Sequence, residues 1–315
     1  MKIVILDYKT LGDDLDLSGA EKYGTVTKYP VTSQEEAPER VRDADIIIVN
    51  KVKMNEAVLK NATHLKLICE TATGYDNIDI NYCKSRGILV ANTPAYSTSC
   101  VAQVTVSMAC SLLTHLQEYR DFVHKGLYQK SISANMLEPV YHEMDGLTWG
   151  IIGYGNIGKK VGKIAEAFGC HVIANKRTST KECECVSLEE LLQRSDIISI
   201  HCPLTDKTRG MIGKEQLAKM KRNAVIINVA RGAIWDEEAV ADAIIDGTIG
   251  GVGCDVFSYE PMDASHPFTK ILNYDNVILT PHMAWGAFES RTRCFNTVLS
   301  NIDAYLNGKE QNLIK

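Results

Sequence analysis

The sequence predicts an α/β protein made of two doubly wound parallel sheets, each covered by helices. Short apolar segments alternate with polar, helix-like segments over residues 1–95, and the same alternation returns between Leu147 and Thr280. Alternation of this kind is typical of a parallel sheet with helices on its faces. The length of 315 residues also suggests two domains.

The strands are expected where the apolar segments lie. The first series is KIVILDY (2–8), ADIIIVN (44–50), LKLICET (65–71) and ILVANT (88–93). The second series is TWGIIG (148–153), HVIANK (171–176), DIISIHC (196–202), AVIINVA (224–230), GGVGCDVF (250–257) and VILTPH (277–282).

Two amphipathic helices are expected outside these series. A long helical segment follows Ser97, and the last helix covers 287–306 and ends at Asn307-Gly308. The apolar stripe of the first is Val101, Val104, Met108, Leu112 and Leu116, and that of the last is Phe295, Val298, Ile302 and Leu306.

Composition excludes several classes of protein. The formal charge is −5 with acids and bases interspersed, which argues against a nucleic-acid partner, because phosphate binding needs a basic face. The start, MKIVILDYK, is interpreted as a strand and not a signal peptide, and no apolar run approaches the roughly 20 residues that cross a bilayer. We therefore expect no membrane association.

The ten cysteines are scattered, several of them inside apolar runs, which favours reduced thiols and a cytoplasmic location. Cys183 and Cys185 are separated by one residue, and no second pair follows them. This spacing is short for zinc, so we expect a surface loop there and no metal site.

A glycine-rich loop lies between a strand and a helix at Gly153-Tyr-Gly155-Asn-Ile-Gly158. In this context GxGxxG indicates a dinucleotide site. Gly153 would make the tight turn, Gly155 would let a pyrophosphate approach the backbone, and Gly158 would let helix and strand pack closely. The start of the following helix offers free N–H groups to the phosphates. The alternative is a glycine turn in an ordinary α/β domain.

The next strand ends in two cations where such sites usually have an acid. Lys176 lies eighteen residues after Gly158, at the place where a carboxylate would bind the ribose 2′-hydroxyl. Lys176 and Arg177, with the hydroxyls of Thr178 and Ser179, would instead attract a 2′-phosphate. We therefore expect NADP to be favoured over NAD. The alternative is that both cations are solvated and NAD is used.

Three polar residues each follow a strand of the second series, where ligands bind in open α/β sheets: Arg231, Glu260 and His282. Each alone has an ordinary structural interpretation, but together they indicate a hydride-transfer site. The planar guanidinium of Arg231 can bind two oxygens of a 2-oxo acid at once. His282 would protonate the ketone oxygen, and Glu260 would favour its charged form. Asp255 would hold the nicotinamide end.

The chain resembles the D-2-hydroxyacid dehydrogenases over essentially its full length. NKV (50–52), Gln103, Trp285 and the ending GKEQNLI resemble the glycerate dehydrogenase/hydroxypyruvate reductase branch of that family. The motifs that carry the family resemblance are TATGYDNID (71–79), STSCVAQVT (97–105), GIIGYGNIG (150–158), HCPLTDKTRGMI (201–212), NVARGAIWDEEAV (228–240), GCDVFSYEP (253–261) and LTPHMAW (279–285).

The resemblance implies a set of site residues. Arg231, Glu260 and His282 would be catalytic. The substrate would be bound by Ala72, Thr73 and Gly74, with Arg231 and His282, and Lys51 is either a rim charge that attracts the anion or a solvated lysine. The cofactor would be bound by Thr73, Gly153, Gly155, Asn156, Ile157, Gly158, Lys176, Arg177, Thr178, Cys202, Pro203, Thr208, Val229, Ala230, Arg231, Asp255, His282, Ala284 and Trp285.

The resemblance also implies an organisation. Residues 1–97 and 286–315 would form a flavodoxin-like substrate-binding domain, and residues 98–285 a Rossmann dinucleotide-binding domain, with a cleft between them that closes over the reactants. It further implies a homodimer formed through the second domain and the 98–125 helix. Two residues depart from the family pattern: Lys176 replaces the usual acid, and Gln103 stands where many relatives have Glu.

The expected activity is the NAD(P)-dependent reduction of a small 2-oxo acid, hydroxypyruvate or glyoxylate first, to the D-2-hydroxy acid. One alternative is another substrate: pyruvate, a branched or aromatic 2-oxo acid, or a 3-phosphorylated one, for which Lys51, Lys53 and Lys60 are candidate cations. The other is a nucleotide-sensing, corepressor-like binding protein. The complete Arg/Glu/His set favours an enzyme.

Overall fold

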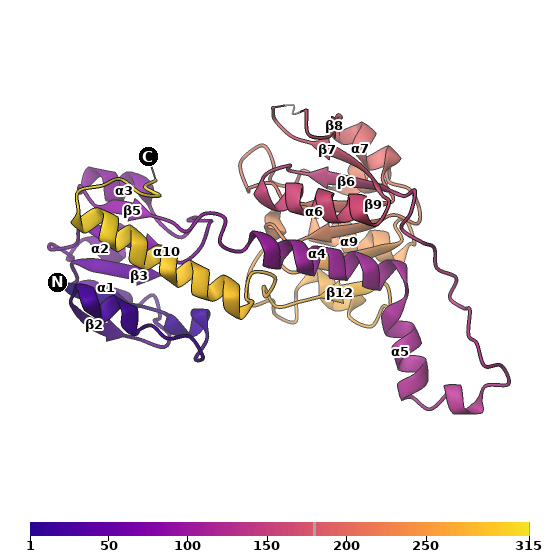
Figure 1. The fold of residues 1–315 in the computed structure, drawn as a ribbon, viewed down its shortest axis with the longest axis horizontal. Coiled ribbons are helices and arrows are strands. Elements are labelled where there is room, and N and C mark those ends of the chain that lie inside the picture. Colours follow the sequence, from indigo (N-terminus) through magenta and orange to yellow (C-terminus); the bar gives the residue numbers. More distant parts are fainter. Residues whose placement is uncertain (179–180, 315) are drawn as a thin grey trace. The chain divides into compact units, whose positions relative to one another are not determined.

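The computed structural model describes residues 1–178 and 181–314. The chain divides into two compact units (Figure 1): unit 1 is Met1–Ser97 with Gly286–Lys315, and unit 2 is Thr98–Trp285. Unit 1 is therefore discontinuous in sequence, and its last helix returns from the far end of the chain.

The sheet of unit 1 is parallel, with the order β2-β1-β3-β4-β5. This is the flavodoxin-like order. Its central strands are fully buried runs, as parallel strands covered on both faces require. The strands are β1 (Lys2–Ile5), β2 (Thr25–Lys28), β3 (Ile46–Val49), β4 (Leu67–Glu70) and β5 (Leu89–Ala91).

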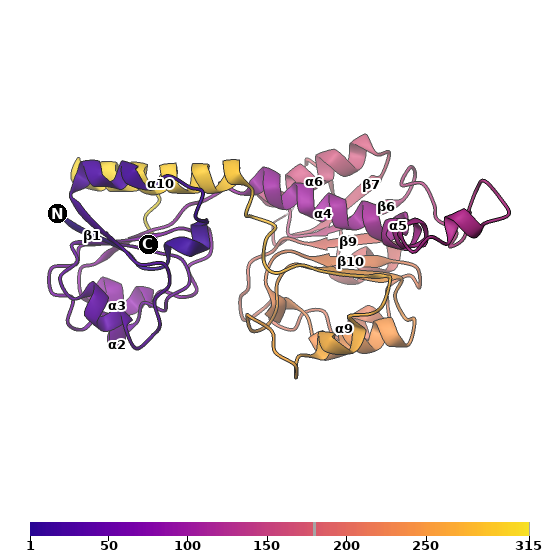
Figure 2. The same cartoon turned by 90° about the horizontal axis from the view of Figure 1, so that it is seen from below.

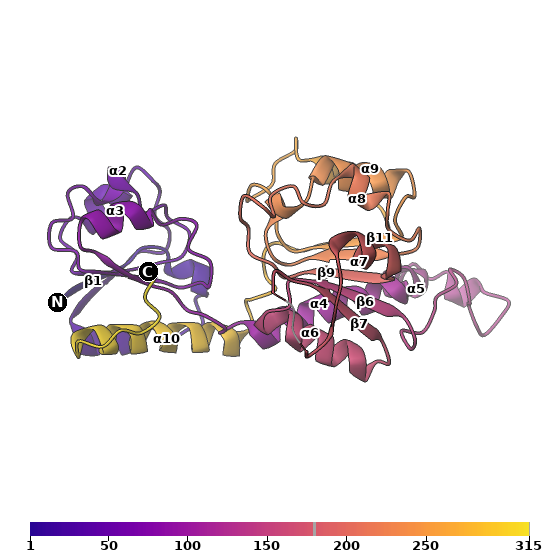
Figure 3. The ribbon, with the colours of Figure 1, turned by 90° about the horizontal axis from the view of Figure 1, so that it is seen from above.

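Helices cover both faces of this sheet. In Figures 2 and 3, α10 (Phe288–Leu306) lies along one face, and α2 (Glu56–Leu59) and α3 (Ile80–Ser85) lie on the other. Both α2 and α3 begin at a side-chain cap, Asn55 and Asp79 respectively. The remaining elements are η1 (Tyr8–Leu11), η2 (Ser18–Tyr23) and α1 (Ala37–Val41).

The described part of unit 2 contains a seven-stranded parallel sheet with the order β12-β11-β10-β9-β6-β7-β8. Numbered within the unit, this is the Rossmann order, and it reverses between β6 and β9, where ligands bind. The strands are β6 (Thr148–Ile152), β7 (His171–Asn175), β8 (Glu184–Cys185), β9 (Ile197–Ile200), β10 (Val225–Asn228), β11 (Gly251–Cys254) and β12 (Val277–Leu279).

Successive side chains of a strand point to opposite faces of the sheet, so each face has its own hydrophobic core. Ile226 faces the core beneath α7, α8 and α9, while Ile227 faces the core beneath α4 and α6. Figure 2 shows α4 and α6 opposite α9. The helices of unit 2 are α4 (Thr98–Leu113), α5 (Leu116–His124), η3 (Tyr128–Lys130), α6 (Asn156–Ala167), α7 (Leu188–Arg194), α8 (Lys214–Leu217), η4 (Gly232–Ile234), α9 (Glu237–Ile245) and η5 (Pro267–Ile271).

The predicted fold class and the ten predicted strands are confirmed, and three details are corrected. Edge strands β2 and β8 were missed, and β8 replaces the surface loop expected at Cys183–Cys185. The expected long helix breaks at His115, whose φ of 52° is left-handed, so Leu116 leaves the buried stripe and is 59% exposed. Leu306, at the end of the last helix, is also exposed.

Within the described ranges, no single helix is long and apolar enough to span a membrane. Only α4 and α5 taken together, across their 66° bend, reach that length and composition. Eight residues of α4 are buried in the protein.

Candidate active site

The carboxyl edge of the sheet in unit 2 carries the residue that follows β10, Arg231. Asn228, the last residue of β10, fixes this turn: its Nδ2 donates to the carbonyl of Arg231 at 2.9 Å, and its Oδ1 accepts from the amide of Ala230 at 3.0 Å. Arg231 is half-buried with an extended backbone. These two bonds fix the backbone of the turn at Arg231, and Nη1 of Arg231 donates to the carbonyl of Ala230 at 2.8 Å.

Glu260 and His282 form an ion pair at the same edge. Nδ1 of His282 lies 2.6 Å from Oε2 of Glu260, and the two side chains are 26% and 29% exposed. The other oxygen, Oε1, accepts from the amide of Phe257 at 3.1 Å. A carboxylate beside Nδ1 fixes the tautomer of the ring and stabilises the imidazolium. Nε2 is then the ring nitrogen that can exchange a proton with a substrate.

The backbone of His282 is itself unusual, with φ of 53° in the left-handed region. Asp255, 1% exposed, holds this turn: its carboxylate accepts from the hydroxyl of Thr280 at 2.5 Å and from the amides of Met283 and Ala284 at 2.8 and 2.9 Å. Burial raises the pKa of Asp255, and these hydrogen bonds oppose the shift. Asp255 therefore builds the His282 loop, a role that the sequence did not reveal.

Gly232 explains how the loops that carry Arg231 and Glu260 approach each other. A Cβ on Gly232 would lie 2.0 Å from the carbonyl carbon of Phe257 and 2.3 Å from the amide nitrogen of Ser258. Only glycine permits this contact, so the segment that leads to Glu260 packs directly on the turn that presents Arg231.

The glycine-rich loop has the geometry that the motif predicts. Gly153 has φ of +94°, and a Cβ there would lie 2.5 Å from the amide nitrogen of Cys202. A Cβ on Gly158 would lie 2.3 Å from the carbonyl oxygen of Gly153. By contrast, a Cβ on Gly155 would meet no atom of the described residues within 4 Å.

Gly155 is the N-cap of α6, and no side chain from the described ranges caps this helix. The first-turn amides of α6 have no acceptor within the helix, and the space beside Gly155 is open. A pyrophosphate suits this space, because an uncapped helix N-terminus favours an anion.

The cationic residues follow β7 directly. Lys176 is half-buried, and Arg177 and Thr178 are exposed, while Ser179 lies outside the described residues. The carbonyl of Asn175, the last residue of β7, accepts from the amide of Gly153 at 2.9 Å, so the strand end is tied to the glycine loop.

An acid also lies in this region. Lys159 is 2.7 Å from Glu182 and lowers the pKa of that carboxyl, and the charge of Lys176 adds to the effect.

The other predicted cofactor residues lie at the same carboxyl edge. Cys202, Pro203 and Thr208 follow β9, where the hydroxyl of Thr208 donates to the carbonyl of Pro203 at 2.7 Å. Val229 and Ala230 follow β10, and Ala284 and Trp285 follow β12.

His201 was not predicted. Its buried ring nitrogens have no hydrogen-bond partner within the described part of the chain, and burial lowers its pKa to about 3. The ring is therefore neutral.

Unit 1 holds the remaining predicted residues on neighbouring loops. The carboxylate of Asp7 accepts from the amides of Asn50 and Lys51, the latter at 2.7 Å, and Asn50 donates through Nδ2 to Thr71 Oγ1 at 2.8 Å. The loop at 72–74 follows directly, and Thr73 Oγ1 donates to the carbonyl of Thr93 at 3.0 Å. Lys51 and Thr73 are exposed.

Glu70 lies beneath these loops and is fully buried. Its Oε2 accepts from Asn77 at 3.0 Å, whereas Oε1 has no hydrogen-bond partner among the residues described. Burial raises the pKa of Glu70 well above its usual range, although the bond from Asn77 opposes this. The folded protein therefore favours the neutral form of this side chain.

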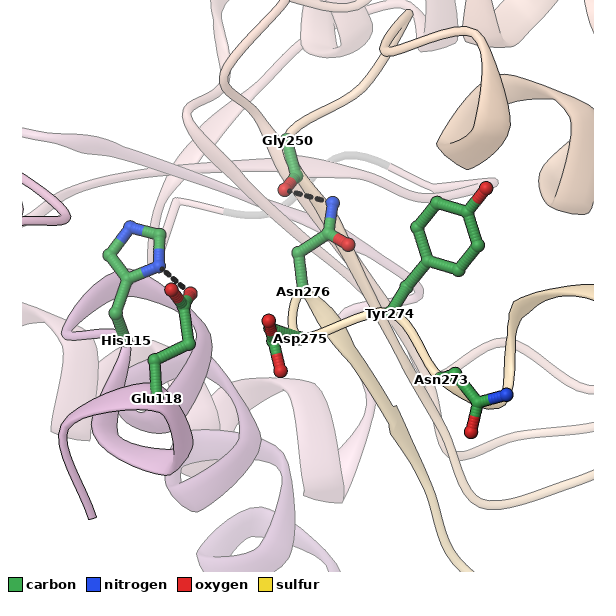
Figure 4. Close-up of a pocket in the computed structure, with 7 residues that line it drawn as sticks. All are labelled: His115, Glu118, Gly250, Asn273, Tyr274, Asp275 and Asn276. Atoms are coloured by element: carbon green, nitrogen blue, oxygen red, sulfur yellow. Dashed lines mark hydrogen bonds and ion pairs between the residues drawn. The ribbon is translucent and has the colours of Figure 1, made fainter. Parts of the chain in front are cut away.

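A pocket of about 480 Å³ lies elsewhere in unit 2 (Figure 4). It is at the amino ends of β11 and β12, where His115 Nδ1 lies 2.7 Å from Glu118 and Asn276 donates to the carbonyl of Gly250 at 2.9 Å. The predicted site residues do not line it, since they occupy the opposite, carboxyl edge of the sheet. Across the ranges that the structure describes, no group of three or more His, Cys, Asp or Glu side chains is arranged to hold a metal ion.

Comparison with protein families gives one match. Residues 106–284 match the model described as "D-isomer specific 2-hydroxyacid dehydrogenase, NAD binding domain".

Two relatives are similar over the whole chain. A hydroxypyruvate reductase of Blautia hydrogenotrophica is 37% identical and a glycerate dehydrogenase of Methylorubrum extorquens is also 37% identical, and each alignment covers 100% of this chain and 99% of the relative.

Solved structures agree in fold. An acyclic imino acid reductase in complex with NADPH and D-Arg has a TM-score of 0.90 at 31% identity, covering 100% of both chains. The D-lactate dehydrogenase of Aquifex aeolicus, with NAD and lactic acid, has a TM-score of 0.82 at 31% identity, covering 98% of this chain and 96% of that one.

Proposed function

Because this chain belongs to the D-isomer specific 2-hydroxyacid dehydrogenase family, we propose that it reduces hydroxypyruvate to D-glycerate or glyoxylate to glycolate. The observation that carries this proposal is the 2.6 Å pair of His282 and Glu260 on the same sheet edge as Arg231. The names of the similar proteins support the choice of hydroxypyruvate as the first substrate to test.

The proposed roles follow from the chemistry of each side chain. A reduced nicotinamide dinucleotide, when bound, would supply the hydride that the carbonyl carbon accepts. Nε2 of His282 gives its proton to the carbonyl oxygen, and Glu260 stabilises the imidazolium beforehand. The planar guanidinium of Arg231 binds one carboxylate oxygen and the carbonyl oxygen of the substrate. Both oxygens are therefore oriented before reduction.

Unit 1 is proposed to bind the substrate carboxylate through the backbone amides at 72–74. The hydrogen bond that Thr73 donates, and those that the amides of Asn50 and Lys51 donate to Asp7, hold these loops at one edge of the sheet. Lys51, exposed beside them, would raise the local concentration of an anionic substrate.

Preference for NADP over NAD is proposed from the end of β7. Lys176 stands where an acid would repel a 2′-phosphate, and Arg177 and Thr178 are exposed next to it. Glu182 opposes this argument, although its charge is paired with Lys159. Among similar structures, one holds NADPH and another holds NAD, so relatives alone do not decide the preference.

A homodimer is proposed from the segment that follows α4. Figure 1 shows α5 and η3 extending away from the rest of unit 2. Residues 116–141 also expose several large apolar side chains. An apolar surface of this kind is typical of a protein interface. The most exposed are Ile132, Leu137, Val140, Leu116, Val123 and Tyr141.

A cytoplasmic location is proposed because all ten cysteines, which lie within the described residues, are free thiols. The charge of −5 supports the absence of a nucleic-acid partner.

An absorbance assay at about 340 nm, where the reduced cofactor absorbs and the oxidised one does not, tests the proposal. The purified protein is mixed with NADPH or NADH and then with hydroxypyruvate, glyoxylate, pyruvate or a 3-phosphorylated analogue. We expect oxidation of the cofactor with hydroxypyruvate or glyoxylate at a kcat/KM in the ordinary enzyme range, about 10⁴ M⁻¹s⁻¹ or more. Tight cofactor binding with no oxidation by any of these acids would overturn the proposal.

A further inference from the structure

We propose that Glu237 and His266 are positioning residues, which hold the segment 257–259 so that Glu260 meets His282. Neither touches the expected reactants. The inference rests on the proposed function, because it assigns these two residues to the acid–base pair of that reaction.

Glu237 is a buried carboxylate turned toward this segment. It is the first residue of α9, after the N-cap Asp236, and its side chain is 6% exposed. Its Oε1 accepts from the amide of Ser258 at 2.8 Å, and its Oε2 accepts from the hydroxyl of Ser258 in a short hydrogen bond. A buried charge is costly unless it is compensated, so the two bonds make Ser258 the main partner of Glu237.

His266 packs beneath the same segment and is completely buried. Its Nδ1 accepts from the amide of Phe268 at 3.2 Å, so the ring proton is on Nε2. Nε2 lies 3.1 Å from Oε2 of Glu237, a close contact at a poor angle for a hydrogen bond. The Nε2–H of the ring thus faces the carboxylate.

The ring of His266 also contacts the residues on both sides of Ser258. Its centroid lies 5.5 Å from that of Phe257 and 5.2 Å from that of Tyr259, and Phe268 completes the cluster at 5.3 Å. Three consecutive residues, 257 to 259, are therefore fixed by one carboxylate and one imidazole.

The next residue is Glu260, and the fixed segment also binds its side chain. The amide of Phe257 donates to Oε1 of Glu260, while Oε2 meets Nδ1 of His282. From the other side, the backbone of Phe257 and Ser258 rests on Gly232. A shift of Ser258 therefore moves both the backbone of Glu260 and the amide that orients its carboxylate.

Glu237→Gln tests the inference, because it keeps the shape but places an N–H donor against either Ser258 or His266. The matched control is Glu238→Gln, on the next residue of α9, which is 53% exposed and paired with Lys270. We expect Glu237→Gln to lower kcat by about 10-fold or more, since a misplacement of about 1 Å can cost roughly 10²-fold in rate. The affinity for the cofactor should change little. Glu238→Gln should have the wild-type kcat.

A double-mutant cycle separates positioning from general damage. In a Glu260→Gln background, Glu237→Gln should cause less than about a 2-fold further loss of kcat, because its effect passes through Glu260. An equal loss in both backgrounds would overturn the inference. Ser258→Ala, which removes one hydroxyl, should show a smaller loss with the same dependence on Glu260, and it serves if Glu237→Gln does not fold.

A readout without turnover distinguishes this inference from the proposed function. The ¹⁵N chemical shift of His282 Nδ1 reports its bond to Glu260, and it should change in Glu237→Gln but not in Glu238→Gln. If the wild type reduced none of the acids tested, the proposed function would fail, and this shift would still decide the positioning role. An unchanged shift in a folded Glu237→Gln protein counts against it.

Discussion

Glu260 Oε2 lies 2.6 Å from His282 Nδ1, although 22 residues separate them in sequence. The two arrive from neighbouring strands, β11 and β12, whose carboxyl ends meet at one edge of the sheet. A carboxylate beside Nδ1 fixes the proton on that nitrogen, and in the proposed reaction Nε2 of His282 donates the proton to the substrate.

Glu260→Gln should lower the rate of reduction. Glutamine keeps the shape but has no carboxylate to hold Nδ1 of His282, so kcat should fall by about 10-fold or more, toward the roughly 10²–10⁴-fold contribution of an acid–base group. The measurement is kcat for the reduction of hydroxypyruvate, with the exposed Glu238→Gln as the control. A kcat equal to that of the wild type would contradict the role of Glu260 beside His282.

Arg231→Lys should be nearly as harmful as Arg231→Ala. Lysine keeps the charge but loses the planar fork that holds two oxygens, so kcat/KM should fall by about 10²–10³-fold in both variants. Steady-state kinetics with hydroxypyruvate measures this loss. Arg222→Ala, an exposed arginine of the same unit, is the control and should be neutral. Full activity in Arg231→Lys would refute bidentate binding.

Lys176→Asp should change the preferred cofactor. The new carboxylate would repel a 2′-phosphate and accept from a ribose hydroxyl, so the ratio of kcat/KM for NADPH to that for NADH should drop by about 10-fold or more. Lys214→Asp makes the same charge change at an exposed residue of α8 and should leave the ratio unaltered. A wild type that clearly prefers NADH would already contradict the NADP proposal.

Glu70 should make unit 1 less stable as pH rises. Burial raises its pKa above the ordinary value of 4.5, so the folded state keeps a proton that the unfolded state releases. Stability is then lost between the unfolded and folded pKa, at up to about 1.4 kcal/mol per pH unit. Glu70→Gln mimics the neutral form and should remove this loss.

Urea unfolding at acidic and neutral pH measures the effect of Glu70. The stability of Glu70→Gln relative to the wild type should increase toward neutral pH, whereas Glu35→Gln, an exposed control, should show no such trend. A difference that stays constant with pH would mean that Glu70 is ionised in the folded state.

Much of the fold was predictable because buried parallel strands are apolar runs. Ile46–Val49 and Val225–Asn228 are examples. Strand β2 was missed because its residues, TVTK, are mostly exposed at a sheet edge and carry no apolar run. The break at His115 was missed because the apolar stripe continues to Leu116, and only the left-handed backbone of His115 interrupts it.

The site was predictable in part for a similar reason. Arg231 and His282 each follow a recognisable strand, and parallel strands bring their carboxyl ends together. The supporting residues gave no such signal. Glu237 resembles the exposed Glu238 beside it in the sequence, and nothing in the sequence shows that Asp255 holds the His282 loop, because both features depend on burial and on hydrogen bonds with distant segments.

The most direct test of the account is the single-turnover rate of hydroxypyruvate reduction by His282→Asn. Asparagine tolerates the left-handed backbone at this position, so the loop should keep its shape while the proton donor is lost. We predict a rate about 10²–10⁴-fold below that of the wild type, with cofactor binding retained. A variant that binds the cofactor and reduces the acid at the wild-type rate would contradict the assignment of His282 as the proton donor.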